Sequence, residues 1–359
     1  MKTISVMIKP ASAACNLRCR YCFYADISEN RDVPVNTMMR AETTEVITKR
    51  LAEAVAGEGL ANISFQGGEP VLAGLDYFRH FVSCMKQYPG IRVNYALQTN
   101  GTLINEEWAD FFKENDFLIG VSLDGYQTNM DQFRFDAEHK SVYYRILDNI
   151  ETLRKKGVSF NILTVVTSTL AGHAKGLLNF YLNHHYEYVQ LIPCLPGLEG
   201  SGADFAMKPA DYEKFYIEFF DCWQKAVLKG HRLSVNLFDN LFSMLRGQMP
   251  YQCGMIGRCS MQYVIESNGD TYPCDFYCLD EYRLGNLEDM SFAEMNDTQV
   301  SAEFLKTPCM KQPCMSCRYR TMCNGGCRRQ NVCYLTDEEC GYQKALDHIL
   351  PLLSRMRMG

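Results

Sequence analysis

Short apolar runs alternate with amphipathic segments from Ile4 to about Leu195. Runs with period-two alternation predict strands, and apolar positions three and four residues apart predict helices. The predicted strands are Ile4–Ile8, Asn62–Gln66, Val93–Gln98, Phe117–Ser122, Phe160–Val166 and Tyr188–Pro193. The predicted helices are Ala41–Ala56, Asp76–Gln87, Asn105–Glu114, Val142–Lys156 and Ala174–Asn183. Six β–α repeats predict a parallel sheet but are too few for a closed eight-fold barrel. The predicted fold class is therefore α/β, a partial (β/α)6 TIM-type barrel.

The pattern changes after this first part of the chain. Glycines and a proline cluster in residues 196–202, which is typical of a linker. Two helices are predicted next, Pro209–Leu228 and Val235–Arg246, and cysteines dominate from Cys253 onward. We therefore expect a barrel domain over residues 1–200, a helical bridge over 201–250 and a C-terminal cysteine-rich domain over 251–359.

A group of three cysteines directly follows the first predicted strand. Cys15, Cys19 and Cys22 have C-x3-C-x2-C spacing, and the carboxyl end of a strand is where such sheets place functional residues. Soft thiolates favour iron–sulfur clusters or zinc, but the loop contains no histidine to complete a four-ligand zinc site. Three thiolates on a cubane cluster would leave one iron open to chelate an amine and a carboxylate.

Polar residues and glycines also follow later strands. The second predicted strand ends in Gln66-Gly67-Gly68-Glu69-Pro70, where paired glycines permit close backbone approach and a carboxylate can accept hydrogen bonds from an ammonium group. Taken alone, this segment is explained more readily by an ordinary strand-to-helix turn. The same alternative applies to Asn100-Gly101 and Asp124-Gly125 after strands three and four.

The C-terminal cysteines form a second field. They are spaced C-x5-C-x14-C and then C-x2-C-x5-C-x3-C, with the members Cys253, Cys259, Cys274, Cys314, Cys317, Cys323, Cys327 and, further on, Cys340. Residues 263–272 read as a β-hairpin with an Asn-Gly turn that would bring Cys259 and Cys274 together. On spacing alone, two structural zinc sites and two iron–sulfur clusters fit equally well.

Composition narrows the class of protein. The chain has 359 residues, 47% of them hydrophobic and 22% charged, with a net charge of −6 and 17 cysteines. Without a basic arm or a long apolar run, we expect no nucleic-acid partner and no membrane span. The odd, large number of cysteines and the absence of a signal-peptide pattern predict a reducing, cytoplasmic location.

The first cysteine motif resembles the signature of the radical S-adenosylmethionine (SAM) enzymes. The resemblance implies that Cys15, Cys19 and Cys22 hold a SAM-binding [4Fe-4S] cluster and that Tyr21 lies near the adenine. It implies that the segment Gln66-Gly67-Gly68-Glu69 binds the methionine amine of SAM. Further SAM contacts are implied for Ser122, Arg134 and Leu195, and substrate contacts are predicted for Tyr24 and Gln98.

The C-terminal field resembles the SPASM extension of radical SAM enzymes that modify peptides and proteins. The resemblance implies two auxiliary [4Fe-4S] clusters with interleaved ligands. One would use Cys253, Cys259, Cys274 and Cys327, and the other Cys314, Cys317, Cys323 and Cys340. Cys333 competes with Cys340 for the last place, and Cys340 is favoured because its longer return leaves room for a helical turn. Fully ligated clusters of this kind suit electron transfer.

Asp275 is a candidate general base, since it directly follows Cys274 in the sequence Cys-Asp-Phe-Tyr. Position alone favours a turn cap or a contact that supports the cluster. Nearly the whole chain, however, resembles the anaerobic sulfatase-maturating enzymes, in which this aspartate is the proton acceptor. The resemblance implies that SAM cleavage yields a radical that takes a hydrogen atom from Cβ of a cysteine or serine. Asp275 would remove the thiol or hydroxyl proton, and an auxiliary cluster would accept the remaining electron.

The implied product is Cα-formylglycine in an unfolded sulfatase polypeptide, with a flavodoxin or ferredoxin as the electron donor. The alternative is a SPASM peptide maturase that forms a thioether or carbon–carbon crosslink in a ribosomal peptide. Only 14 residues precede Cys15, which argues against the N-terminal peptide-recognition domain that such maturases often carry. A non-catalytic zinc or iron–sulfur module is the remaining alternative. The sequence does not distinguish cysteine from serine as the residue that is oxidised.

Overall fold

The computed structural model describes residues 2–32 and 37–356, and the chain divides into two compact units made of discontinuous segments. Unit 1 comprises Met1–Ser122, Arg134–Phe160 and Ser260–Lys306. Unit 2 comprises Leu123–Phe133, Asn161–Cys259 and Thr307–Gly359. Within the described residues, no helix is both long and apolar enough to cross a bilayer.

Unit 1 is built on a sheet with the strand order β10-β9-β8-β1-β2-β3-β4. Its strands are β1 (Lys2–Ile8), β2 (Gly59–Phe65), β3 (Ile91–Thr99), β4 (Leu118–Ser122), β8 (Val264–Ile265), β9 (Asp270–Tyr272) and β10 (Gly285–Asn286). Strands β1 to β4 pair in parallel, and β8 pairs in parallel with β1. The parallel strands therefore end at one edge, which also receives the hairpin formed by β8 and β9.

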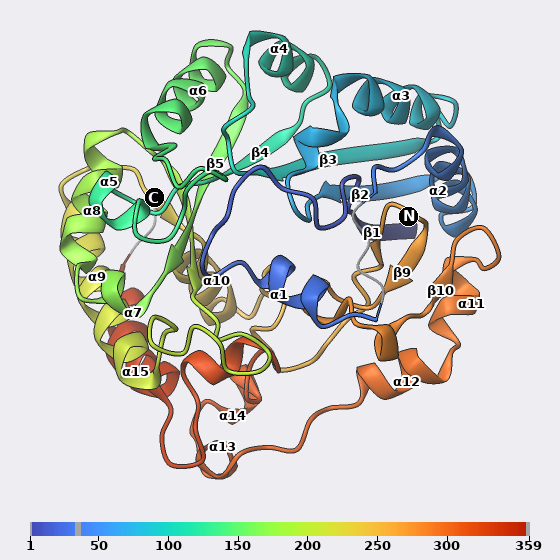
Figure 1. The fold of residues 1–359 in the computed structure, drawn as a ribbon. Helices are drawn as coiled ribbons and strands as arrows, with labels where there is room; N and C mark the ends of the chain where they lie inside the picture. The colour runs from blue at the N-terminus through green and yellow to red at the C-terminus, as the bar shows by residue number, and fades with distance from the viewer. Residues whose placement is uncertain (1, 33–36, 357–359) are drawn as a thin grey trace. The chain divides into compact units, whose positions relative to one another are not determined.

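Helices cover this sheet because its strands carry apolar side chains. The helices of unit 1 are α1 (Phe23–Glu29), α2 (Ala41–Ala54), α3 (Leu75–Lys86), α4 (Glu106–Glu114), α6 (Tyr143–Lys155), α11 (Phe292–Asn296) and α12 (Gln299–Leu305). Phe65, at the end of β2, packs its ring against Phe78 and Phe81 of α3, with ring centroids 5.0 and 5.1 Å apart. Helices α2 and α3 lie outside the strands, whereas the short α1 lies on the opposite side (Figure 1).

Unit 2 contains the remaining parallel strands and most of the cysteines. Its strands are β5 (Ser159–Val166, whose first two residues are counted in unit 1), β6 (Tyr188–Pro193) and β7 (Ser234–Val235). Its helices are α5 (Gln127–Met130), α7 (Ser168–Ala171), α8 (Ala174–Asn183), α9 (Pro209–Leu228), α10 (Asn236–Leu245), α13 (Gln312–Met315), α14 (Arg320–Cys323) and α15 (Gly341–Leu353). Helices α9 and α15 pack side by side (Figure 1).

All six predicted parallel strands and the seven predicted longer helices are present, with ends that shift by at most a few residues. The hairpin with the Asn-Gly turn is present as β8 and β9. Helix α4 begins at Glu106 because the side chain of Asn105 accepts a hydrogen bond from the Trp108 amide. The predicted α/β fold with a partial barrel is confirmed.

Three of the elements that were not predicted lie next to predicted features. Helix α1 begins directly after Cys22, the last cysteine of the first motif. Strand β7 lies within the predicted helical bridge and pairs in parallel with β6. Helix α15 follows Cys340, whose sulfur accepts a hydrogen bond from the Gln343 amide at 3.3 Å.

Candidate functional site

The first cysteine loop lies between β1 and α1 in unit 1. Its three sulfurs are half-buried, and the loop is held by Leu17, which is buried, and by the Arg18 amide, which donates to the Phe135 carbonyl at 2.8 Å. The Leu17 amide and the Asn100 side chain point at the Cys15 sulfur, at 3.4 and 3.7 Å. Such N–H···S contacts are typical of the thiolate ligands of iron–sulfur clusters, so the loop fits the cluster that the sequence predicts.

Gly67 and Gly68 bring the second strand's turn against this loop. The Gly68 amide donates to Ser12 O at 2.7 Å, and the Glu69 amide donates to Ala14 O at 2.8 Å. A Cβ atom on Gly68 would lie 2.0 Å from Ala14 O, and Gly67 has a φ of +118°. Paired glycines at this place were expected to permit close approach to a bound ligand. The structure shows that they permit contact with the backbone immediately before Cys15.

Glu69 is fully buried at the end of this turn. Its carboxyl group accepts hydrogen bonds from the Thr99 hydroxyl at 2.8 Å, the Asn100 amide at 2.7 Å and the Val71 amide at 3.2 Å. Burial raises the pKa of Glu69 to about 7, against these donors and the charge of Arg134. An ionised carboxylate has about four acceptor positions, so it has capacity for one further donor such as an ammonium group.

Asn100 joins Glu69 to the cysteine loop, a role that sequence reasoning missed. Its main-chain amide binds Glu69, while its side chain donates to Asn16 Oδ1 at 2.8 Å and contacts Cys15. The dipeptide Asn100-Gly101 could not reveal this contact, because Asn16 lies 84 residues away from Asn100 in the sequence.

Tyr21 and Arg134 also meet in unit 1. A guanidinium nitrogen of Arg134 donates to the Tyr21 hydroxyl at 2.9 Å, and Arg134 is buried. Gln98 and Ser122 lie half-buried near the ends of β3 and β4, the edge at which the cysteine loop also begins. Leu195 follows β6 and belongs to unit 2.

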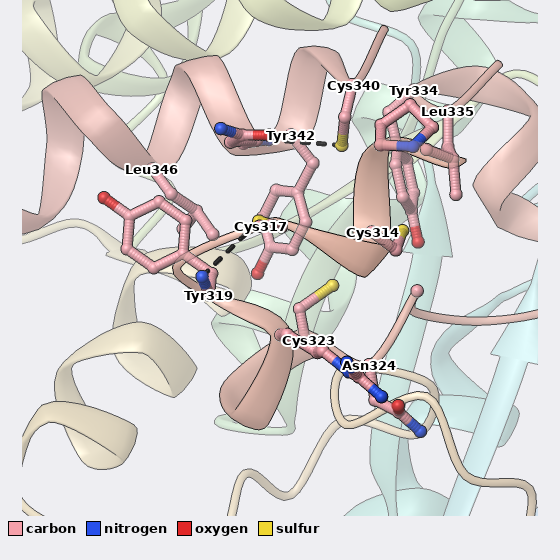
Figure 2. Close-up of a pocket in the computed structure, with 14 residues that line it drawn as sticks. Cys314, Cys317, Tyr319, Cys323, Asn324, Tyr334, Leu335, Cys340, Tyr342 and Leu346 are labelled. Carbon is pink, nitrogen blue, oxygen red and sulfur yellow. Dashed lines mark hydrogen bonds between the residues drawn. The ribbon is translucent and has the colours of Figure 1, made fainter. Parts of the chain in front are cut away.

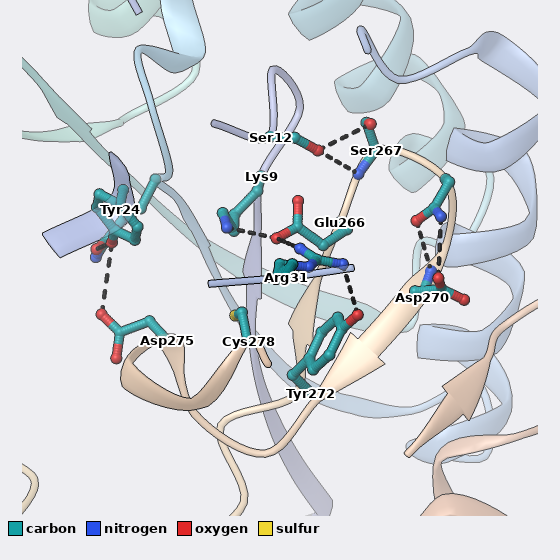
Figure 3. A network of polar contacts seen from close by, with 12 residues as sticks. Lys9, Ser12, Tyr24, Arg31, Glu266, Ser267, Asp270, Tyr272, Asp275 and Cys278 are labelled. Atoms are coloured by element: carbon teal, nitrogen blue, oxygen red, sulfur yellow. Dashed lines mark hydrogen bonds and ion pairs between the residues drawn. The ribbon is translucent and has the colours of Figure 1, made fainter. Parts of the chain in front are cut away.

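Asp275 lies beside Tyr24, which in turn contacts Gln66. The hydroxyl of Tyr24, on α1, donates to Gln66 Oε1 at 3.1 Å and lies 3.5 Å from Asp275 Oδ2 (Figure 3). Burial raises the pKa of Asp275, while the nearby Lys9 charge opposes that rise. A half-buried carboxylate beside a tyrosine hydroxyl is suited to accept a proton.

A buried ion cluster supports this corner of unit 1 and was not predicted. Glu266 accepts from Lys9 at 2.5 Å and from Arg31 at 3.1 Å, and all three side chains are at most 5% exposed. Arg31 also donates to the Tyr272 hydroxyl at 2.7 Å (Figure 3). The cluster joins β1, the segment after α1 and the β8–β9 hairpin, and that hairpin leads into Cys274 and Asp275. No sequence pattern signals it, because Lys9 and Glu266 are 257 residues apart.

Four cysteines line one pocket in unit 2 (Figure 2). They are Cys314, Cys317, Cys323 and Cys340, and the tyrosines Tyr319, Tyr334 and Tyr342 surround them. Burial and the neighbouring thiols of Cys340, Cys314 and Cys317 raise the pKa of Cys323 to about 12. So many thiols can ionise together only beside a strong positive charge, and an iron–sulfur cluster provides that charge.

Cys340 and Cys333, the two candidates for the last ligand, have different environments. Cys340 lies in the pocket at the start of α15, where the Gln343 amide donates to its sulfur. Cys333 is fully buried and donates to the Cys194 carbonyl at 3.3 Å. The structure therefore brings Cys340 to the other three cysteines and turns the Cys333 thiol to the main chain.

Three members of the other cysteine set lie in unit 2. A Cβ atom on Gly254, next to Cys253, would lie 2.6 Å from the Cys327 Cβ. The charge of Cys327 raises the pKa of Cys259, in addition to the larger effect of burial, so these two cysteines are also neighbours. The fourth predicted ligand, Cys274, belongs to unit 1.

Within the described residues, no three His, Cys, Asp or Glu side chains converge as the ligands of a single metal ion do. The ligands of a cubane cluster stand further apart, because each thiolate binds a different iron atom.

Profiles of two protein families match this chain. The profile of the Radical SAM superfamily matches residues 10–173. The profile of an iron–sulfur cluster-binding domain (SPASM) matches residues 253–318. Together with the cysteine loop and the Gly67-Gly68-Glu69 turn, these matches define the chain as a radical SAM protein with a SPASM extension.

More specific relatives narrow the family. The chain is 42% identical, over 92% of its length and 89% of the relative, to the cysteine-type anaerobic sulfatase-maturating enzyme of Clostridium novyi. It is 29% identical to the serine-type enzyme of Bacteroides thetaiotaomicron, over 99% of this chain and 92% of that relative. The structure of native anSMEcpe with bound AdoMet matches with a TM-score of 0.89 and 38% identity, covering 98% of each chain. The chain belongs to the anaerobic sulfatase-maturating enzyme family.

The first prediction concerns Glu69. With a pKa of about 7, the carboxyl group is ionised above that pH and neutral below it, so we expect it to accept hydrogen bonds from the SAM amine well only above it. We expect SAM affinity to fall about tenfold between pH 8 and pH 6. Glu69→Gln should bind SAM at least about tenfold more weakly at pH 8 and should lack this pH dependence. Anaerobic equilibrium dialysis with labelled SAM measures both, and a wild-type affinity that rises as pH falls would contradict the assignment.

The second prediction separates Cys340 from Cys333. Three [4Fe-4S] clusters correspond to about twelve irons per chain. Cys340→Ser should reduce the iron content toward about eight, because its pocket loses one ligand. Cys333→Ser is the matched control, since serine retains a donor for the Cys194 carbonyl and should leave the iron content unchanged. The opposite result in the two variants would make Cys333 the ligand.

Proposed function

We propose that this chain oxidises a cysteine in an unfolded sulfatase segment to Cα-formylglycine, with Asp275 as the general base. The observation that carries the proposal is the partly buried contact of Asp275 with the Tyr24 hydroxyl, 3.5 Å away, which also donates to Gln66. Family membership supplies the reaction class, and structures of anSMEcpe with bound peptides show that a relative with this fold accepts a peptide substrate.

The chain's own residues hold the cofactors and manage the substrate's proton. Cys15, Cys19 and Cys22 would hold the cluster that binds SAM, and Glu69 would accept hydrogen bonds from the SAM amine. Once bound, the cluster and SAM supply the radical chemistry that removes hydrogen from carbon. Tyr24 and Gln66 would orient the substrate side chain, and Asp275 would take its thiol proton. Loss of one further electron, for which an auxiliary cluster would be the acceptor, leaves a thioaldehyde, and water hydrolyses it to formylglycine with release of hydrogen sulfide. Burial of Asp275 favours the neutral acid, and this helps the carboxylate to accept a proton.

Several features support the choice of cysteine over serine. Cysteine-type relatives are 40 to 42% identical to this chain, whereas serine-type relatives are 29 to 30% identical. A thiol also ionises more readily than a hydroxyl, so a base of modest strength is sufficient. The donor that we propose is a flavodoxin or ferredoxin in a reducing cytoplasm.

The third prediction tests the base. Asp275→Asn keeps the shape of the side chain but cannot accept a proton, so formylglycine formation should fall at least about a hundredfold. SAM cleavage, measured as methionine release, should remain within about threefold of wild type. Tyr24→Phe is a useful comparison, since it removes one contact of Asp275 but leaves the carboxylate and should cost less. Unchanged formylglycine formation by Asp275→Asn would remove Asp275 from this role.

The fourth prediction tests the substrate class. On matched sulfatase peptides that differ only in Cys or Ser, we expect kcat/KM to be at least about tenfold higher for the cysteine peptide, a difference of ~1.4 kcal/mol. Aldehyde capture with a hydrazide and mass spectrometry identify the product. Loss of hydrogen without a capturable aldehyde would instead favour the crosslinking peptide maturase.

A further inference from the structure

Asn240 is a fully buried polar side chain in the middle of α10, in unit 2. Asparagine is a poor helix former, and a buried amide is costly unless its hydrogen-bonding groups find partners. Such a residue inside a helix therefore needs a structural or functional reason.

Asn240 has four hydrogen-bond partners, and two of them lie outside its helix. Its Nδ2 donates to the carbonyl of Asn236 at 2.8 Å and to the Asn236 side chain at 2.6 Å. Its Oδ1 accepts from the main-chain amides of Tyr251 at 2.8 Å and Gln252 at 3.2 Å. The amide is thus oriented by its own helix, and its oxygen is directed at the residues immediately before Cys253.

The segment that it binds lacks regular secondary structure, and its buried apolar side chain, Met255, lies after Cys253 rather than beside Tyr251 and Gln252. Residues 248–259, all described by the structure, form turns and bends rather than helix or strand. Met249 and Tyr251 are 72% and 70% exposed. Since these side chains contribute little burial, the two hydrogen bonds from Asn240 supply specific anchoring of this backbone.

The other side of Cys253 is fixed by close backbone packing. Gly254 has a φ of +84° and lies against Cys327, while Gly257 lies against the Asn324 carbonyl. The Asn324 side chain in turn donates to Gly257 O at 3.3 Å. Cys253 therefore lies between two anchors, one made by Asn240 and one made by these glycines.

We propose that Asn240 is a positioning residue that holds Cys253 in place to ligate an iron–sulfur cluster together with Cys259 and Cys327. The inference rests on the proposed ligand set. Asn240 itself would touch neither cluster nor substrate and would act through the main chain of Tyr251 and Gln252. A role confined to stabilising α10 would require only the bonds to Asn236.

The fifth prediction compares three variants of the full-length enzyme, assembled anaerobically. Asn240→Leu has nearly the same size but no acceptor, so the iron content should fall from about twelve to about eight per chain. The amides of residues 251 and 252 should exchange hydrogen at least about tenfold faster. Asn240→Asp keeps the acceptor oxygen and should retain more iron than Asn240→Leu. Asn236→Ala, the matched control, removes only the side-chain partner of Asn240 within α10, keeps the carbonyl partner and should retain about twelve irons.

Cys253→Ala separates failure of the inference from failure of the ligand assignment. If Cys253→Ala keeps about twelve irons, the assignment is wrong and the inference fails with it. If Cys253→Ala loses about four irons but Asn240→Leu loses none, only the inference is overturned. SAM cleavage reports whether unit 1 remains intact, and we expect Asn240→Leu to retain it. Equal losses of iron and SAM cleavage in Asn240→Leu and Asn236→Ala would indicate a general role in α10 and would overturn the proposal.

Discussion

The close approach of the Gly67-Gly68 backbone to the chain just before Cys15 is the contact on which the site in unit 1 depends. The parallel register of β1 and β2 makes this contact possible. Ile8 lies opposite Phe65, so the loops that follow the two strands start at the same edge of the sheet. The Gln66 amide donates to Ile8 O, and two further amides continue this pairing into the loops. A side chain on Gly68 would overlap Ala14 O and separate the loops. The cysteine loop and Glu69 are therefore positioned by main-chain hydrogen bonds, which tolerate little variation in geometry.

Burial of charge is the second constraint, and it acts on both carboxylates of the site. Removal from water raises the pKa of Glu69 and of Asp275, which prepares the first to respond to an ammonium group and the second to accept a proton. The ion cluster of Lys9, Arg31 and Glu266 contains one more positive than negative charge. Removing Glu266 would leave the buried Lys9 charge without its carboxylate partner, so Glu266 also fixes the β8–β9 hairpin against β1. That hairpin leads into Asp275. The ion cluster therefore helps to fix the position of Asp275, and its Lys9 charge also acts on the pKa of that carboxyl group.

The sequence predicts the regular elements well and the long-range polar contacts poorly. Strands such as Tyr188–Pro193 and helices such as Ala174–Asn183 agree with the structure residue for residue, because their periodicity is local. Resemblance to known families supplied most of the candidate site residues, and the structure brings together Tyr21 with Arg134, and Tyr24 with both Gln66 and Asp275. The partners of Asn100, Glu266 and Asn240 could not be predicted, since each depends on which loops the fold brings together. The reason for the glycine pair was likewise visible only once the neighbouring backbone was in place.

The two cysteine groups of unit 2 obtain their geometry in different ways. The pocket of Cys314, Cys317, Cys323 and Cys340 is formed by short helices, by the start of α15 and by a shell of tyrosines, and Cys314 is buried. Cys253 is exposed and lies in an irregular segment that one asparagine and two glycines hold in place. A ligand in a regular, buried setting is ordered by the fold itself, whereas a ligand on an exposed loop relies on specific anchors and on the metal. Solvent exposure also tunes the reduction potential of a cluster. Two chemically identical clusters, one held by buried ligands and one held partly by an exposed loop, would therefore have different reduction potentials.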